Sequence, residues 1–234
     1  MSHERSTSGA ARISPSGARR AALWDMDGVL VDSADYHYAA WREALAREGY
    51  DLRLDEFRAT FGQRNDTILR RIFGADLPDA EVARIATVKE ALYRRFVQER
   101  GIAPLPGVLR WLKALHEAGW RQAVASAAPR ANVDVVLEAL GIGRFFDAIT
   151  SAEDVTRGKP DPQVYLVSAE RVGVPPRCCV VIEDAPAGLE GARRAGMRCI
   201  GVTSTHDHLD ADVVVASLDA LDDDAFDRLI ARCA

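Results

Sequence analysis

The sequence predicts an α/β protein, a doubly wound parallel sheet with an α-helical domain inserted after its first strand. Short apolar runs alternate with amphipathic helical patterns along most of the 234 residues. The interval from residue 35 to residue 103 breaks this alternation, because its apolar residues follow the helical period alone. Two aspartates, Asp25 and Asp27, close the first short run and mark the edge of the sheet where a site is expected.

The alternating part of the chain supplies strands and covering helices. Six runs are expected to be strands, at residues 21–24, 122–125, 148–150, 179–182, 199–202 and 213–215. Two helices show apolar residues at i, i+3, i+4 and i+7, namely Val108, Trp111, Leu112 and Leu115, and Val133, Val136, Leu137 and Leu140. Gly119 and Gly141 follow these helices as expected C-terminal stops.

Three parts of the chain are expected from these patterns. Residues 1–19 are rich in Ser, Gly, Ala and Arg without periodicity and are expected to form a disordered tail. Residues 20–34 and 104–234 form the α/β core, and residues 35–103 form a helical cap joined to it by two linkers. A cap inserted there would sit over the strand ends and Asp25, although an inert helical decoration remains an alternative.

Composition restricts the partners and the compartment. Thirty basic and thirty-five acidic residues give a net charge of −5 without a long charge run, so nucleic acid is not an expected partner. The apolar stretches are too short to cross a bilayer. The four cysteines, Cys178, Cys179, Cys199 and Cys233, lack metal-ligand spacing and are expected to be buried thiols of a cytoplasmic protein.

Further polar residues follow the other strands, at the edge where Asp25 also lies. They are Ser126, Lys159 and the pair Glu183–Asp184. Each has a simple alternative, because the serine could cap a helix, the lysine could be a solvated turn residue and the acidic pair could cap a helix N-terminus. A bare Asp-x-Asp-Gly segment could likewise be a surface turn. Their shared position at the strand ends favours a common site.

The chemistry of this set is coherent. Carboxylates from separate strands can hold Mg²⁺, which prefers oxygen ligands. A magnesium ion, a lysine ammonium and a serine hydroxyl together match the charge and hydrogen-bonding demand of a phosphoryl group. One aspartate can attack phosphorus as a nucleophile, and its neighbour can move the proton of the leaving alcohol and of the incoming nucleophile.

These four motifs, in this order, resemble the haloacid dehalogenase superfamily, and most closely its helical-cap subgroup of β-phosphoglucomutase and sugar-phosphate phosphatases. The resemblance runs from about Leu23 to Val215 and implies a Rossmann-like core. It implies four catalytic residues, which are the nucleophile Asp25, the acid/base Asp27, Ser126 and Lys159. It also implies that Asp25, Asp184 and the main-chain carbonyl of Asp27 ligate Mg²⁺, with Glu183 either a ligand or directly behind the ligands.

The same resemblance extends to the cap. The segment Phe61-Gly62-Gln63-Arg64-Asn65-Asp66 is similar to the subgroup's substrate loop, and Tyr36-His37 and Lys89 match further cap positions. The implied substrate-binding residues are His37, Gly62, Arg64, Lys89, Ser126 and Ala127. From the residues alone, His37 could simply cap or pack a helix, and Lys89 is expected to lie on a solvated helix face.

The expected function is Mg²⁺-dependent phosphohydrolysis of a small phosphorylated metabolite, a sugar phosphate, by a monomer. The resemblance implies that dehalogenases lack an acid/base two residues after the nucleophile and that the phosphonate-cleaving branch also departs there, so Asp27 points to phosphate-ester chemistry. A β-phosphoglucomutase-type sugar phosphate mutase is the main alternative, although Pro129-Arg130 stands where the mutase pattern has a lysine-asparagine pair. A non-enzymatic phospho-accepting regulatory domain and an inactive sugar-phosphate-binding homologue are more remote alternatives.

Overall fold

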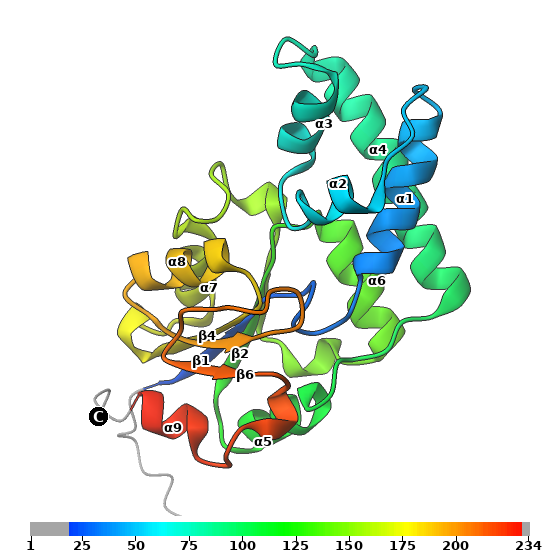
Figure 1. Ribbon diagram of the computed structural model, residues 1–234. Helices are drawn as coiled ribbons and strands as arrows, with labels where there is room; N and C mark the ends of the chain where they lie inside the picture. The colour runs from blue at the N-terminus through cyan, green and yellow to red at the C-terminus, as the bar shows by residue number, and fades with distance from the viewer. Residues whose placement is uncertain (1–18, 231–234) are drawn as a thin grey trace, which may run out of the picture.

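The computed structural model describes residues 19–230 and shows a parallel six-stranded sheet between two layers of helices (Figure 1). The strand order is β3-β2-β1-β4-β5-β6. The strands are β1 Ala21–Trp24, β2 Arg121–Ala125, β3 Ala148–Thr150, β4 Cys179–Glu183, β5 Arg198–Val202 and β6 Val213–Val215. All six predicted strands are confirmed to within one residue at each end, and β1 is central because it pairs with both β2 and β4.

Alternate side chains of the strands face two separate layers of helices. Ala22 and Trp24 contact the layer of α5 (Val108–Glu117), α6 (Arg130–Leu140) and α9 (Ala225–Leu229). Ala21 and Leu23 contact the layer of α7 (Gln163–Val172) and α8 (Pro186–Arg194). Both layers bury a strand's side chains because successive residues point to opposite faces of the sheet. Short 3₁₀ turns connect these elements at Gly143–Phe145, Ala152–Asp154, Pro176–Cys178 and Leu218–Ala220.

Four helices lie between β1 and α5, and they are here termed the insertion. They are α1 (Ala34–Ala46), α2 (Leu54–Arg58), α3 (Asn65–Phe73) and α4 (Asp79–Arg100). The insertion has an apolar cluster of its own that includes Trp41, Phe57 and Leu69. The last turns of α4 join the core cluster through Phe96 and Val97. The prediction of an uninterrupted helical interval is therefore confirmed, whereas its division into domains at residues 34/35 and 103/104 stays a prediction.

The two connections between the insertion and the core run side by side. Val31 and Pro104 form an antiparallel bridge, and the Leu105 amide donates to the Leu30 carbonyl at 3.0 Å. Because one connection directly follows the Asp25 turn, the insertion stands above the carboxyl ends of the strands, as Figure 1 shows.

Some sequence predictions fall outside the described residues. The expected disordered tail, residues 1–19, lies outside them except for Arg19, and so does Cys233. Cys178, Cys179 and Cys199 are buried, as predicted. Among residues 19–230, α4 is the one helix with more than 18 residues, and its charged side chains rule out a membrane span.

Candidate active site

Asp25 leaves the central strand and enters a tight turn. Its amide still donates to the Ile182 carbonyl at 3.0 Å, which continues the pairing with β4. The Gly28 amide then donates to the Val31 carbonyl at 2.8 Å and reverses the chain. Gly28 has a φ of +80°, and a Cβ at this position would lie 2.0 Å from Oδ2 of Asp184. Only glycine lets the turn adopt this conformation while the carboxylate of the neighbouring motif approaches it.

Lys159 joins two of the carboxylates. Its ammonium donates to Oδ1 of Asp25 at 2.6 Å and to Oε1 of Glu183. The carboxylate of Glu183 is also bound by the Tyr165 hydroxyl at 2.8 Å and by the backbone amides of Asp184 and Ala185. Burial opposes the charged form of Lys159, but the two carboxylates outweigh it and raise its pKa well above the usual value. The alternative of a solvated turn lysine is therefore wrong.

The acidic residues carry more negative charge than Lys159 can balance. Burial raises the pKa of Asp25 to about 7, and the charge of Glu183 adds to this effect while Lys159 opposes it. Burial, with the charges of Glu183 and Asp25, raises the pKa of Asp184 to about 9. Carboxylate oxygens of Asp25, Glu183 and Asp184 lie within 4.8 Å of one another. A divalent cation fits this donor set, because it would offset the repulsion that these shifts express.

Asp27 lies in a different environment from Asp25. Ser33 donates its hydroxyl to Oδ1 of Asp27, and Nε2 of His37 lies 3.3 Å from the same oxygen. Burial would raise the pKa of Asp27, but His37 and Ser33 outweigh it and hold the pKa below its usual range. The two aspartates of the Asp-x-Asp motif therefore have separate partners and opposite pKa shifts, a pattern typical of groups with separate chemical tasks.

His37 and Lys89 connect Asp27 to the insertion. The imidazole of His37 stacks on Tyr93 with ring centroids 4.1 Å apart, and its Nδ1 lies 2.9 Å from Nζ of Lys89. Lys89 is only 3% exposed, so the expectation of a solvated helix face is wrong. The helical period could not show this, because the covering residues come from α1. The Lys89 ammonium can only donate, so Nδ1 of His37 must accept and carries no hydrogen. The ring hydrogen is therefore on Nε2, which donates to Oδ1 of Asp27.

The other predicted substrate residues lie in two loops, one after β2 and one before α3. Ser126 follows β2 at the same sheet edge, and its hydroxyl accepts from the Ala128 amide at 3.0 Å across Ala127. Gly62 and Arg64 lie in the loop before α3, and Arg64 pairs with Asp66 at 3.3 Å. The Arg64 side chain also lies against Gly158, next to Lys159. The roles of these residues in binding a substrate stay predictions.

Sequence reasoning missed several residues of the site. Ser33 binds Asp27, Tyr165 binds Glu183, and the Thr205 hydroxyl donates to Oδ2 of Asp184. Ser33 could have been noticed because it lies only six residues after Asp27. No sequence signal marks Tyr165 or Thr205. Tyr165 lies on α7, whose apolar pattern indicates only a buried face, and Thr205 lies in the loop after β5.

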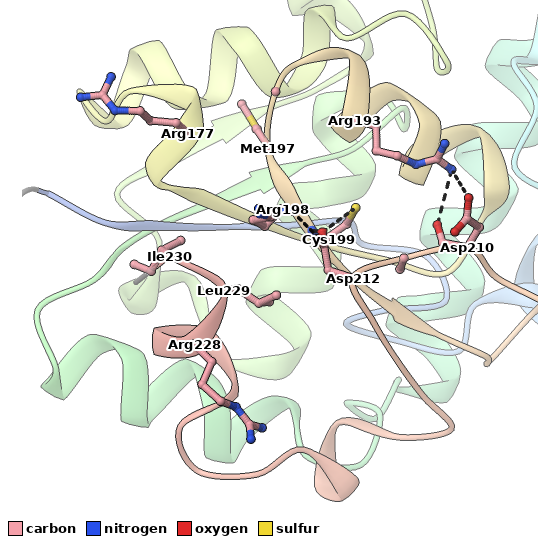
Figure 2. Close-up of a pocket in the computed structure, with 12 residues that line it drawn as sticks. Arg177, Arg193, Met197, Arg198, Cys199, Asp210, Asp212, Arg228, Leu229 and Ile230 are labelled. Carbon is pink, nitrogen blue, oxygen red and sulfur yellow. Dashed lines mark hydrogen bonds and ion pairs between the residues drawn. The ribbon is translucent and has the colours of Figure 1, made fainter. Parts of the chain in front are cut away.

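A cavity of about 770 Å³ lies at the opposite end of the sheet, beside the start of β5 and the end of α9 (Figure 2). Arg193 and Arg198 line it, but they pair with Asp210 at 3.3 Å and with Asp212 at 2.7 Å. Arg228 also lines it and points away from Asp212 in Figure 2. Because these arginines already have carboxylate partners, the strand ends remain the better site for a phosphate ester.

Comparisons with known proteins agree with this geometry. Hexitol phosphatase B of Escherichia coli is 34% identical over 86% of this chain and 93% of its own length. The fructose-1-phosphate phosphatase of the same bacterium is 33% identical over 77% of this chain and 94% of its own length. The crystal structure of β-phosphoglucomutase from Clostridium difficile superposes with a TM-score of 0.80 at 29% identity, covering 92% of this chain and 98% of that one.

The family model for haloacid dehalogenase-like hydrolases matches residues 19–196, which include Asp25, Ser126, Lys159 and the Glu183–Asp184 pair. This span contains the insertion and most of the sheet. The chain therefore belongs to the haloacid dehalogenase-like hydrolase family.

Proposed function

We propose that this protein is a Mg²⁺-dependent phosphohydrolase that cleaves a small sugar phosphate through an aspartyl-phosphate on Asp25. The observation that carries the proposal is the position of Asp25, held by Lys159 on one side and close to Asp184 on the other. Two of the similar proteins are named as phosphatases of fructose 1-phosphate and of hexitol phosphate, which supports this substrate class. The expected absence of nucleic-acid partners, the monomeric state and the cytoplasmic location are parts of the same proposal.

Asp25 and Asp184 would hold the metal ion, together with the main-chain carbonyl of Asp27. Bound there, Mg²⁺ would neutralise negative charge on the transferring phosphoryl group. Glu183 fits a different role, because Lys159, Tyr165 and two backbone amides already occupy its oxygens. Glu183 therefore orients Lys159 from behind the site.

The reaction would proceed in two steps on the protein's own side chains. In the first step, a carboxylate oxygen of Asp25 forms a bond to phosphorus while the bond from phosphorus to the sugar oxygen breaks. Asp27, which must be protonated for this step despite its lowered pKa, gives that proton to the leaving oxygen. In the second step, Asp27 takes a proton from water, the water oxygen attacks phosphorus, and the Asp25 carboxylate leaves. Ser33 and His37 stabilise the ionised form of Asp27 that this second step needs.

Sugar-phosphate mutase activity is a second candidate function, and the position of the insertion favours it. Arg64 of the insertion lies against Gly158, beside Lys159, so the insertion contacts the core next to the site. An insertion closed over the site would exclude water and favour a sugar hydroxyl as the acceptor of the phosphoryl group. The solved β-phosphoglucomutase with the same fold is consistent with this candidate.

One assay distinguishes the two candidates. The protein is incubated with Mg²⁺, β-glucose 1-phosphate and a trace of glucose 1,6-bisphosphate, and separately with fructose 1-phosphate and a hexitol phosphate. Steady release of inorganic phosphate from the sugar phosphates is expected for the phosphohydrolase. Formation of glucose 6-phosphate without free phosphate would instead establish the mutase. The variant Asp25→Asn should be inactive in both, and turnover near the wild-type rate in that variant would refute an aspartyl-phosphate on Asp25.

A further inference from the structure

The buried carboxylate of Glu90 on α4 connects three separate elements. Its Oε1 accepts from Nδ2 of Asn65 at 2.7 Å and from Nζ of Lys89 at 2.9 Å. Its Oε2 accepts from Nδ2 of Asn132 at 2.6 Å. Asn65 begins α3 directly after Arg64, and Asn132 lies in the first turn of α6, shortly after Ser126. One side chain therefore ties the Arg64 loop of the insertion to the core.

Asn132 completes the connection from the core side. It is fully buried, and its Oδ1 accepts from Nη1 of Arg94, one turn after Glu90 on α4, at 3.0 Å. Both ends of its amide are thus bound by the insertion. Buried polar groups lose much free energy when they lack partners, so these bonds fix the position of α4 on α6 closely. Burial opposes the charged form of Glu90, but Lys89, His37 and Asn65 outweigh it and hold its pKa below the usual value.

The Arg64 loop meets the core at a second point. A Cβ on Gly158 would lie 3.1 Å from Cδ of Arg64, so the arginine stem lies directly on this glycine. The φ of Gly158 is not positive, and the missing side chain therefore matters for space rather than for backbone conformation. Because Lys159 is the next residue, this contact places the Arg64 side chain against the loop that carries Lys159.

We propose that Glu90 and Asn132 are positioning residues that latch the insertion over the site and fix Arg64 where it binds the sugar part of the substrate. The proposal rests on the proposed function for its substrate class, but the latch itself is a property of the fold. Substrates with hydroxyl groups or a second phosphate within reach of Arg64 would depend on the latch. A phosphate ester without such groups would not depend on it.

A kinetic cycle tests the dependence on substrate. The proteins are wild type, Arg64→Ala, Asn132→Ala and the double variant, and the substrates are fructose 1-phosphate and p-nitrophenyl phosphate. Asn132→Ala should raise KM for fructose 1-phosphate by roughly 10-fold, with little change in kcat/KM for p-nitrophenyl phosphate. The KM of the double variant for fructose 1-phosphate should be no higher than that of Arg64→Ala alone, because both changes remove the same interaction. Equal losses on both substrates, or additive losses, would overturn the proposal.

Amide hydrogen exchange tests the latch without relying on turnover. The first turn of α3, where the Ile68 amide donates to the Arg64 carbonyl at 3.1 Å, should exchange faster in Asn132→Ala than in wild type, whereas α5 should not change. Asn65→Ala cuts the latch at its other end and should give the same result if Asn132→Ala folds poorly. Glu138→Ala, on the exposed face of α6, is the matched control.

The kinetic and the hydrogen-exchange experiments test the proposed function and the latch separately. Unchanged exchange at α3 in both latch variants would refute the latch whatever the enzyme's substrate is. Absence of hydrolysis of either substrate by the wild-type protein would refute the proposed function, while the exchange result would still decide whether the latch exists.

Discussion

The ammonium of Lys159 lies 2.6 Å from Oδ1 of Asp25, and both side chains are almost completely buried. Lys159 also donates to Glu183, so a single cation separates two carboxylates at neighbouring strand ends. Without it, Asp25 and Glu183 would face each other with no positive charge between them. The pKa of Asp25, already raised to about 7 by burial, would rise further, and less of the carboxylate would be ionised for its proposed attack on phosphorus.

Lys159→Met should therefore lower kcat/KM by at least about 10²-fold, because it removes both the charge partner of Asp25, the proposed nucleophile, and a proposed donor to the phosphoryl group. Steady-state phosphate release at saturating Mg²⁺ measures the loss. Lys159→Arg should not restore activity, because a wide planar guanidinium would not fit where the Lys159 ammonium lies 5.4 Å from the ring centroid of Tyr165. Lys113→Met is the control, since Lys113 is an exposed lysine on α5. A variant at Lys159 with normal kcat/KM would contradict the assigned role.

Asp27→Asn should slow turnover by roughly 10²- to 10⁴-fold, the usual contribution of a general acid/base. An amide keeps the shape of the side chain and can still accept from Ser33, but it cannot take a proton from water. Phosphate release and, after rapid quenching, the fraction of phosphorylated protein measure the two steps separately. Asp32→Asn, an exposed aspartate in the same turn, is the control and should retain wild-type rates. If Asp27→Asn turned over normally, the proton would have to move through another group.

Asp184 and Glu183 should differ in how their loss affects the requirement for Mg²⁺. Asp184→Asn removes a proposed ligand and should raise the Mg²⁺ concentration that gives half-maximal activity. Glu183→Gln removes the charge that holds Lys159 and should lower kcat. It should leave the Mg²⁺ concentration for half-maximal activity unchanged, because the oxygens of Glu183 contact Lys159, Tyr165 and backbone amides. Activity across a Mg²⁺ titration, after treatment with a chelator, distinguishes the two effects. Equal shifts in both variants would make Glu183 a metal ligand.

The strands and the grouping of Asp25, Lys159 and Glu183 could be predicted from sequence for a simple reason. Buried parallel strands are short apolar runs, and their carboxyl ends must meet at one edge of the sheet. A polar residue that directly follows such a run is therefore expected at that edge of the sheet. The first-strand register confirms this, because Trp24 pairs with Ile182 and brings Asp25 level with Glu183.

The partners that tune these residues could not be predicted in the same way. Lys89 and Glu90 are polar residues on a long helix, where the apolar period suggests a solvated face. Their burial depends on α1, α3 and α6, which meet α4 only in the folded chain. Asn132 is similar, because a polar residue in the first turn of a helix is usually explained as part of a cap. Long-range packing, rather than local propensity, decides these positions.

The latch carboxylate should make stability depend on pH in a defined direction. The pKa of Glu90 is lower in the folded protein than its usual value of about 4.5, so the folded state favours its ionised form. Its contribution to stability is therefore complete above that value and is lost as the pH falls through the folded pKa. At pH 7, Glu90→Gln should lower the free energy of unfolding by about 1–3 kcal/mol, because the amide leaves Lys89 without a charged partner.

The difference between wild type and Glu90→Gln should shrink when denaturant unfolding is repeated at successively lower pH, down to about pH 4 and below. Glu99→Gln, a change of an exposed glutamate at the end of the same helix, should leave the free energy of unfolding almost unchanged at every pH. Comparing the two variants removes the effect of other acidic groups, whose titration is common to all three proteins. A difference that stays constant or grows as the pH falls would mean that Glu90 is not held in its ionised form by Lys89 and Asn65.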